Sequence, residues 1–471
     1  MTVQLPIEAL VDPVCGLVRE LVPVDRHEGM PDRYVAYTAE VADSRRFGVW
    51  PSDRVALYTA EVADSRRFGV WPSDRVALGT TFGDPEGARI AAIAEAVERY
   101  CGNYVPAGLR RASAKELTAA GERHLGPADL PFYADWQFEQ PGFPFAPFTE
   151  DLQILWTWGE EDGASGCWVP ASFVYLNWRQ GTRCGEPRLN HLNYAGIATG
   201  QGLADAKLRA LLEIVERDAL NLWWGLGGPA RGIRPESVPG LAADLAGSRL
   251  CCHLVEMPNE FGVPAVAALV WDPELRIAAA GFAARFDPAE AATKAVLEAV
   301  HTWVFTQGLT TADGWVFRAI EAGILGRGLY LDFRADRRYL DDAGPRFERV
   351  RDLGAHVQVW LDHRLHPLMR RFSEPAELVD VAAIPSGSEA ELYARLAEGG
   401  HRVVTVDLTT PDIAETPLRV ARVAVSGLIP NAPAAFPYLG YPRWTEAALR
   451  RGWRDRPVTP DTFTFAPPPH M

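Results

Sequence analysis

The sequence predicts an α+β protein in which mixed β-sheets are packed by helices. Apolar residues recur at helical spacing after residues that commonly begin helices, and this pattern occurs three times. Residues 250–284 indicate three strands, alternating or wholly buried, and further strands are expected near 152–158, 168–176 and 402–407. The chain of 471 residues is long enough for two or three domains or for one large α/β unit.

Composition excludes several classes of protein. A hydrophobic content of 48% and a charged content of 23% are typical of a soluble globular protein, and no apolar run reaches the ~18 residues of a membrane span. The N-terminus lacks a basic region followed by an apolar core, so we expect no secretory signal and a cytoplasmic location. The net charge of −14 argues against general nucleic-acid binding. The six cysteines show no CxxC spacing, which disfavours a zinc site or a disulfide framework.

We expect three regions along the chain, at 1–78, 79–435 and 436–471. The first contains a tandem duplication, because residues 37–57 recur without a change at 58–78. Each copy indicates a strand, a turn and a second strand, and we expect one copy to serve the fold and the other to be a tolerated surface insertion. The last region ends in a proline-rich tail, which suits an extended strand or a polyproline arm.

The helix that follows Gly202 places several charged side chains on one narrow face. At ~100° per residue this face contains Asp205, Arg209, Glu213 and Glu216. The carboxylates border the core side of the helix, where like charges are costly unless a cation neutralises them. The alternative is a solvated face on which the acids pair with the neighbouring arginines. The apolar stripe beside this face is expected at Leu208, Leu211, Leu212, Val215, Ala219 and Leu222.

Two further helices carry acids in a similar position. Asp84 and Asp287 are expected as N-caps, each followed by proline at the first helical position. On the third helix Lys294, Glu298 and His301 share one face. On the first, a Glu-x-x-Glu-Arg pattern matches that at residues 213–217. The first helix has an apolar stripe at Ile90, Ile93, Ala94, Val97 and Cys101, next to a face formed by Ala91, Glu95, Glu98 and Gly102.

Convergence of the three helices would assemble one pocket of acids with cations at its rim. Hard oxygen ligands suit Mg²⁺, and arginine and lysine suit phosphate. The chain has no GxxxxGK[ST], kinase or GxGxxG motif, so a nucleotide site would be of an uncommon type. The expected acids are Glu95, Glu98, Asp205, Glu213 and Glu216, and the expected cations are Arg99, Arg217 and Lys294.

At these residues the chain resembles the YcaO family of cyclodehydratases, which act on ribosomally made peptides. The motifs that carry the resemblance are AxxxExxER at 91–99, GxxxGxxxxDA with ExxERD at 196–218, and DPxxAxxKAxxE at 287–298. The resemblance implies a YcaO-like fold and catalytic core, with ATP and Mg²⁺ held between the helices. It implies metal ligation by Glu95, Glu98, Asp205, Glu213 and Glu216, and ATP binding by Arg99, Gln201, Arg217, Lys294 and Glu298.

The chain departs from the family pattern at several positions. Ala91 stands where serine is common. Arg209 stands where glutamine is usual, and because its charge can replace that of a metal ion, it suggests that fewer magnesium ions are bound. Lys294 replaces an arginine and keeps the charge without the bidentate fork. His301 replaces a glutamine, either as a hydrogen-bonded helix residue or as a catalytic group. The tail ending in Pro467-Pro468-Pro469 matches the family only in part, and suits either placement at the active site or a disordered end.

The resemblance implies ATP-dependent modification of peptide backbone amides in peptide natural product biosynthesis. Phosphorylation of the amide oxygen would allow cyclodehydration of Cys, Ser or Thr to an azoline. The alternatives are a thioamide- or amidine-forming enzyme with the same fold, and a catalytically silent scaffold that binds a peptide or partner protein. The expected partners are a ribosomally made precursor peptide and a separate E1-like or TfuA-like protein that binds its leader, with a homodimer as a further expectation and no nucleic-acid or membrane partner.

Overall fold

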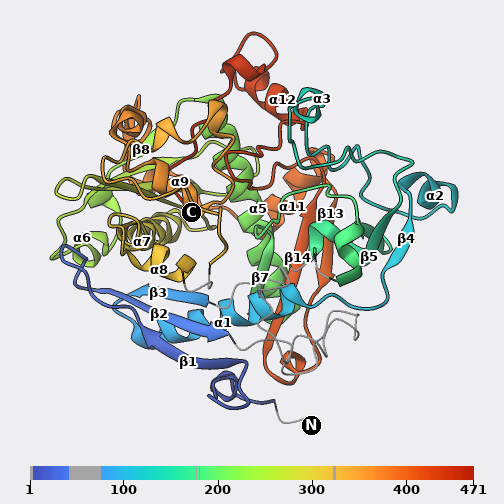
Figure 1. Ribbon diagram of the computed structural model, residues 1–471, viewed down its shortest axis with the longest axis horizontal. Helices are drawn as coiled ribbons and strands as arrows, with labels where there is room; N and C mark the ends of the chain where they lie inside the picture. The colour runs from blue at the N-terminus through green and yellow to red at the C-terminus, as the bar shows by residue number, and fades with distance from the viewer. Residues whose placement is uncertain (1–3, 42–75, 177, 180, 322–324) are drawn as a thin grey trace.

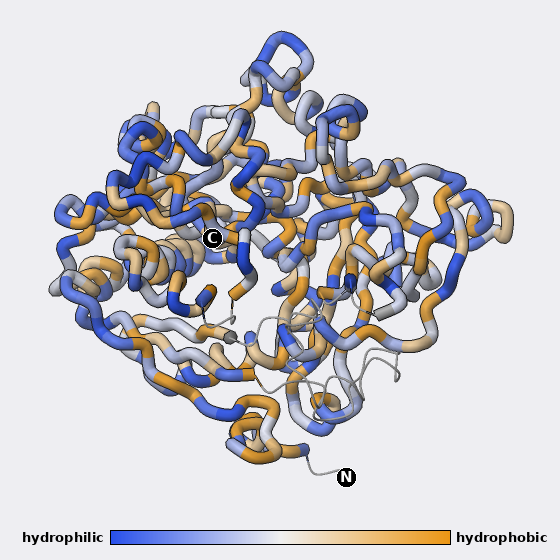
Figure 2. Tube along the Cα trace, viewed as in Figure 1, coloured by the Kyte–Doolittle hydropathy of each residue, from blue (hydrophilic) through white to orange (hydrophobic). Residues whose placement is uncertain are grey.

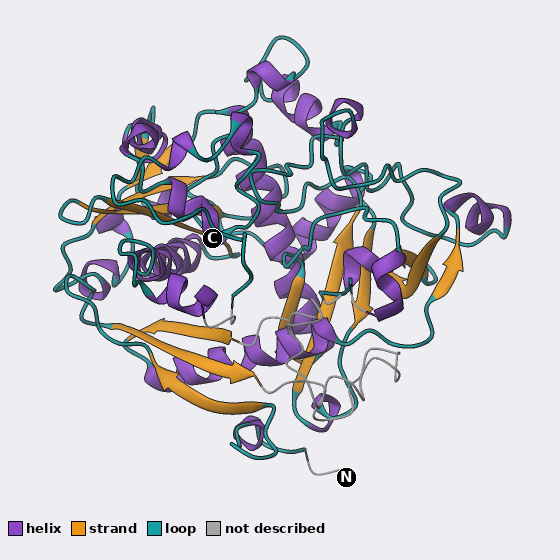
Figure 3. Cartoon of the chain, in the orientation of Figure 1, coloured by secondary structure: helices purple, strands orange, loops and turns teal. Residues whose placement is uncertain are grey.

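Three β-sheets separated by helices form the protein (Figures 1 and 3). The computed structural model describes residues 4–41, 76–176, 178–179, 181–321 and 325–471. The family-like motifs all lie within this described part of the chain. The C-terminus lies near the middle of the view, among the helices, and the N-terminus lies at its lower edge (Figure 1).

The first sheet is antiparallel and has the order β1-β2-β3. Its outer strand β1 spans Val18–Pro23, β2 spans Tyr34–Val41 and β3 spans Val76–Phe82. Helix α1, Pro85–Asn103, follows β3 directly and packs against this sheet. As the sequence predicts, Pro85 occupies the first turn of α1 and the Asp84 carboxylate accepts a hydrogen bond from the Gly87 N–H at 2.9 Å.

The second sheet has the order β11-β10-β9-β8-β12 and is antiparallel except where β12 joins β8. Strands β9, β10 and β11 confirm the three strands expected within residues 250–284, and β10 and β11 are almost wholly buried. Helix α7, Pro288–Gln307, packs along β10 and β11 and begins at Asp287, as predicted. The strands are β8 Arg231–Ile233, β9 Cys251–Glu256, β10 Ala265–Asp272, β11 Ile277–Ala284 and β12 Leu378–Val379.

The third sheet has the order β4-β5-β13-β14-β7, and β6 pairs with β5. Helix α5, Leu203–Leu226, packs on β7 and β14 and also contacts β11 of the second sheet. It therefore lies between the two sheets and contributes residues to the core of each, such as Trp223 to one and Leu222 to the other. The strands are β4 Arg110–Ala112, β5 Ile154–Glu161, β6 Cys167–Pro170, β7 Ile197–Gln201, β13 Val403–Asp407 and β14 Leu418–Val425.

Shorter helices and long loops cover the sheets. The loop that follows the last helix is largely hydrophilic, as expected of a surface segment (Figure 2). Among the helices that the structure describes, none has the length and hydrophobicity needed to cross a membrane. The shorter helices are α2 Ala114–Ala119, α3 Asp135–Phe138, α4 Ala171–Val174, α6 Leu241–Asp244, α8 Trp315–Glu321, α9 Gly354–Val359, α10 Arg370–Ser373, α11 Glu389–Glu398 and α12 Arg443–Arg450.

Two local predictions are wrong. The strand expected at 168–176 ends at Pro170, where the chain turns into the short helix α4. Proline lacks the N–H that would continue the ladder with β5, so the strand has a physical reason to stop there. Ile90 was expected on the apolar stripe of α1, but it is 38% exposed because it lies at the edge of the helix face that Ala92 and Ala96 bury.

The described part of the first sheet uses both copies of the duplication. Strand β2 includes Tyr37–Val41 from the first copy, and β3 begins with residues 76–78 from the second copy. These ends pair directly, with Thr38 opposite Leu78 and Ala39 opposite Ala77. The remaining residues of the duplication, 42–75, lie outside the described residues.

Deletion of residues 42–62 should leave the protein as stable as the parent chain. The deletion removes one repeat length and restores a single intact copy, so the sequences of β2 and β3 do not change. We expect the free energy of unfolding, measured with urea, to change by less than ~1 kcal/mol, because loop length alters closure entropy only slowly. A larger loss would show that both copies contribute to the fold.

Candidate functional site

A cavity of about 360 Å³ lies where α1, α5 and α7 meet, a volume within the range of small-molecule sites. The three helices predicted to converge therefore do so, and each contributes acids and a cation to the lining. The loop that precedes β7 and the end of the C-terminal tail complete the wall. The charged and histidine residues of the lining are Glu95, Arg99, Glu213, Arg217, Lys294, Glu298, His301 and His470.

The α1 wall contains a carboxylate–arginine cluster. The Arg99 guanidinium donates to Glu95 and to Glu98, at 3.0 Å each. Glu95 also accepts a hydrogen bond from the backbone N–H of Leu78 in β3, at 3.3 Å. The Arg99 guanidinium lies 4.7 Å from the centre of the Tyr194 ring, which orders the facing loop by a cation–π contact.

The α5 wall repeats this arrangement with different backbone partners. Arg217 lies 3.6 Å from Glu213 and 3.4 Å from Glu216. Glu213 accepts from the N–H of Gly196 at 3.0 Å, and Glu216 accepts from the N–H of Ala284 at 2.9 Å. Gly196 has a φ of 86°, and a Cβ at this position would lie 2.8 Å from the carbonyl oxygen of Val423. Glycine at this turn thus allows the backbone to reach the Glu213 carboxylate.

On the α7 wall, Lys294 lies 3.3 Å from Glu298. Burial raises the pKa of Glu298, but the Lys294 and Arg217 charges outweigh it and lower the pKa overall. Nδ1 of His301 lies 3.3 Å from the hydroxyl of Tyr34 in β2, and burial lowers the pKa of His301 to about 4. His301 is therefore a neutral imidazole at neutral pH.

The C-terminal tail ends in the pocket. The Arg217 guanidinium donates to Nε2 of His470 at 3.1 Å, and Nδ1 of His470 donates to the carbonyl of Ala280 at 3.1 Å. The N–H of Ala280 donates in turn to the carbonyl of Pro469 at 2.6 Å, so the tail runs along the outer edge of β11. Of the two sequence interpretations of the tail, placement at the site is the one that the structure displays.

Arg422 supports the pocket from behind, and the sequence analysis missed it. This residue of β14 is 1% exposed and donates to the carbonyls of Phe173, Val174, Asn193 and Ala195 at 2.6–3.2 Å. The second pair of these carbonyls belongs to the loop that lines the pocket. Apart from the partly buried Arg419 near its start, β14 is otherwise a buried apolar strand, so the only sequence signal for Arg422 is an arginine within an apolar run.

Some predicted residues stand apart from the lining. Asp205 accepts from the N–H of Gln201 at 2.9 Å and pairs with Arg209 at 2.9 Å, at the exposed start of α5, and neither Asp205 nor Gln201 lines the cavity. Glu98 and Glu216 lie behind the arginines that line it. Within the described residues, no three acidic, histidine or cysteine side chains are already arranged as a metal-binding group.

The residues present fit a magnesium–phosphate ligand by two observations. Burial raises the pKa of both Glu98 and Glu216 to about 8, which neighbouring carboxylates reinforce. A divalent cation would relieve this excess of buried negative charge. The buried Nε of Arg217 has no hydrogen-bond partner among the described residues, so it is a donor for an anionic oxygen.

The free protein should become less stable as the pH rises from about 6 to about 8. The pKa of Glu98 and Glu216 in the folded state, about 8, is above the ordinary 4.5, so folding favours the protonated form. The stability contributed by protonation of these two carboxyl groups is fully present below the ordinary pKa and is lost as the pH rises through about 8. We expect the free energy of unfolding to fall by ~2 kcal/mol or more over this range. Urea unfolding at both pH values measures this change in the free energy of unfolding. In Glu98→Gln/Glu216→Gln the free energy should depend much less on pH. An equal dependence on pH in this variant would contradict the assignment of the effect to Glu98 and Glu216.

Comparison with known proteins identifies sequences similar to this chain. Residues 81–429 match the family described as "YcaO cyclodehydratase, ATP-ad Mg2+-binding". An uncharacterized protein in the tfuA 3′ region of Rhizobium leguminosarum bv. trifolii is 26% identical over 379 residues, 76% of this chain and 78% of that protein.

Solved structures share the fold at low sequence identity. A heterocyclase in complex with substrate and cofactor superposes with a TM-score of 0.66 at 18% identity, covering 98% of this chain. This chain spans only 56% of that heterocyclase. YcaO from Methanopyrus kandleri, bound with AMPPCP and Mg²⁺, has a TM-score of 0.51 at 19% identity over 88% of this chain and 86% of the other.

The fold and the pocket together define an α+β protein with an acid- and arginine-lined site between three helices. The family match covers well over half of the chain, including the described helices that form the pocket. The chain belongs to the YcaO family.

Proposed function

We propose that this protein uses Mg·ATP to modify backbone amides of a ribosomally made peptide, with cyclodehydration of Cys, Ser or Thr to an azoline as its reaction. The observation that carries the proposal is the convergence of two Glu-x-x-Glu-Arg helices and the Lys294–Glu298 pair on one cavity. When bound, ATP supplies the phosphoryl group that converts a peptide amide oxygen into a leaving group. The side chains around the cavity bind and orient, which is how phosphoryl-transfer sites gain most of their rate.

In this proposal the arginines change partners when the ligand binds. In the free pocket Arg99 and Arg217 contact the carboxyl groups of Glu95, Glu98, Glu213 and Glu216. Bound Mg²⁺ would stabilise the ionised form of these carboxyl groups and leave the arginine side chains to bind phosphate. Lys294 and Glu298 on the opposite wall, with Gln201 and Asp205 at the start of α5, complete the proposed set for ATP and metal.

Two alternatives remain distinct from azoline formation. A thioamide- or amidine-forming enzyme would use the same pocket with another nucleophile. A silent scaffold is favoured by the departures at Ala91, Arg209 and His301, but Arg209 pairs with Asp205 outside the cavity lining and leaves the pocket unobstructed. The tfuA-region relative supports a separate partner protein that binds the peptide leader, and a cytoplasmic location is part of this proposal.

Calorimetric titration with Mg·ATP tests the nucleotide site. We expect micromolar binding, which corresponds to about −8 kcal/mol, and at least ~10-fold weaker binding by Glu98→Gln/Glu216→Gln. Glutamine resembles the protonated carboxyl of the free pocket, so the variant should stay folded. Glu256→Gln/Glu391→Gln, which removes two ion-paired acids outside this pocket, is the matched control. Equal binding by all three proteins would place ATP elsewhere, and no binding by a folded parent chain would remove the enzyme hypothesis for the isolated protein.

Mass spectrometry then separates the reactions. Incubation with Mg·ATP and a peptide containing Cys, Ser and Thr should release phosphate and remove one water from the peptide. In parallel incubations that also contain sulfide or an amine, replacement of the amide oxygen by sulfur would identify a thioamide, and loss of water with addition of the amine would identify an amidine. A folded protein that binds the peptide without phosphate release would identify the scaffold.

A further inference from the structure

Arg188 is a partly buried arginine without a polar partner for its guanidinium among the described residues. The guanidinium lies 4.8 Å from the centre of the Phe145 ring, and the structure gives it neither an ion pair nor a hydrogen bond there. Burial, and then the neighbouring charges of Arg179 and Arg351, lower the pKa of Arg188. The neighbouring charges that lower the pKa of this side chain therefore belong to two more arginines.

The other two arginines also lack carboxylate partners within the described residues. Arg179 donates to the backbone carbonyls of residues 184 and 186, and Arg351 donates to the carbonyl of Glu348 at 3.4 Å. Nearby acids are occupied. Glu186 pairs with Arg111, and Asp352 caps the N–H of Gly354 at 2.9 Å. We call Arg179, Arg188 and Arg351 the arginine patch.

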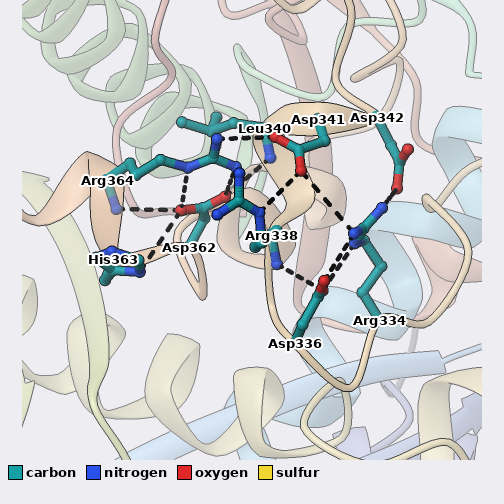
Figure 4. Close-up of polar contacts among 9 residues, drawn as sticks. All are labelled: Arg334, Asp336, Arg338, Leu340, Asp341, Asp342, Asp362, His363 and Arg364. Atoms are coloured by element: carbon teal, nitrogen blue, oxygen red, sulfur yellow. Dashed lines mark hydrogen bonds and ion pairs between the residues drawn. The ribbon is translucent and has the colours of Figure 1, made fainter.

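Residues 334–364, which include Arg351, also contain arginines that do pair with acids. Arg334 pairs with Asp336 and Asp342 at 2.8 Å each, and Arg364 pairs with Asp341 and Asp362 (Figure 4). There, every arginine that Figure 4 draws faces carboxylates. In a chain of net charge −14, three neighbouring arginines without an acid form a local concentration of positive charge, which suits an external anion.

The arginine patch lies next to residues that line the pocket. The Phe145 ring, on which Arg188 lies, contacts Phe436 with centroids 5.1 Å apart, and His191 stacks on the same Phe436 at 5.9 Å. Ala435 donates to the carbonyl of Val350, which places Arg351 next to this cluster. Leu192 and Leu353, one and two residues along the chain from His191 and Arg351, line the pocket itself.

We propose that the arginine patch binds an Asp- and Glu-rich segment of the peptide substrate while the residue to be modified occupies the pocket. The proposal rests on the proposed function for the identity of the ligand as a peptide. Arginine binds carboxylates through paired N–H donors, which suits successive acidic side chains. A nucleic acid is disfavoured because Phe145 and Phe436 are only 7% and 8% exposed and are covered by Arg188 and His191, so they offer no open face for base stacking.

Fluorescence anisotropy of the full chain without nucleotide tests the proposal. The probe is a short fluorescein-labelled peptide of alternating Asp and Glu, compared with its Asn and Gln counterpart. We expect the acidic peptide to bind, the neutral peptide not to bind, and added salt to weaken binding. Arg188→Gln/Arg351→Gln should weaken binding by about 10-fold. Arg234→Gln/Arg395→Gln, which removes the same charge from the residue after β8 and from α11, should leave it unchanged.

Equal weakening by the two double variants would overturn the proposal, because binding would then follow net charge alone. A single-stranded oligonucleotide of equal charge that binds more tightly than the acidic peptide, and loses binding in Arg188→Gln/Arg351→Gln, would also overturn it in favour of nucleic acid. The measurement needs no ATP and leaves every pocket carboxylate in place. Peptide binding that survives while Mg·ATP binding is absent would therefore separate failure of the proposed function from failure of this proposal.

Discussion

Arg422→Met should lower the free energy of unfolding by about 4 kcal/mol. Methionine fills much of the same space but cannot donate to the four carbonyls that Arg422 holds, from Phe173 to Ala195. These buried acceptors would lose a charged donor, and Glu98 and Glu213 would lose a nearby positive charge. Urea unfolding followed by circular dichroism measures the change.

Arg419→Met provides the matched control on the same strand. Arg419 also donates to backbone carbonyls, those of Ala414, Thr416 and Leu418, but it is only partly buried, so water can replace these bonds. We expect its loss to cost less than ~1 kcal/mol. Similar losses in the free energy of unfolding for the two variants would show that the burial of Arg422 does not make its hydrogen bonds more stabilising than those of Arg419. Since Arg422 also fixes the loop at Asn193, its substitution should weaken Mg·ATP binding as well.

Asp218→Ala should destabilise the protein by about 3–5 kcal/mol. Asp218 is fully buried and accepts two hydrogen bonds from Arg443, at 2.6 Å each, and a third from the N–H of Ile429 at 3.0 Å. Alanine would leave the Arg443 charge buried with only Glu260 at 2.9 Å. The readout is the midpoint and slope of urea unfolding.

Two further variants isolate the ion pair. Asp218→Leu/Arg443→Met removes both charges together, and we expect it to be much closer to the parent protein, because a buried pair replaced by apolar groups is often neutral. Glu260→Ala should have a smaller effect than Asp218→Ala, since the Glu260 side chain is 27% exposed. If the double variant were as unstable as Asp218→Ala, the destabilisation could not be attributed to the unpaired charge of Arg443.

The three helices of the pocket were predictable because local chemistry determines where they begin. Asp84 and Asp287 cap their helices, and the acids of each helix lie beside an apolar stripe that must face the core. This pattern was sufficient to bring Glu95, Glu213 and Glu298 to one cavity. For Asp205 the helix pattern of α5 predicted less well. Asp205 lies on the same side of the helix as Glu213, but in the first turn, where it accepts a hydrogen bond from the N–H of Gln201 and does not line the cavity.

Other parts of the site depend on contacts between distant segments. Arg422 lies in a strand whose pattern is that of any buried strand, and its role becomes visible only when Asn193 and Phe173 are placed beside it. The hydrogen bond between Arg217 and His470 depends on the path of the tail along β11, which no local sequence pattern predicts. The arginine patch likewise joins residues separated by more than 150 positions in the chain.

The pairing of β2 with β3 has an evolutionary consequence. Because the two strands take their sequences from the start of one repeat and the end of the next, gain or loss of whole repeats by recombination leaves the paired strands unchanged. Only the intervening length varies, at a site where lengthening has a small entropic cost. The hairpin is therefore a position at which 21-residue units can be gained or lost without changing the paired strands that precede α1.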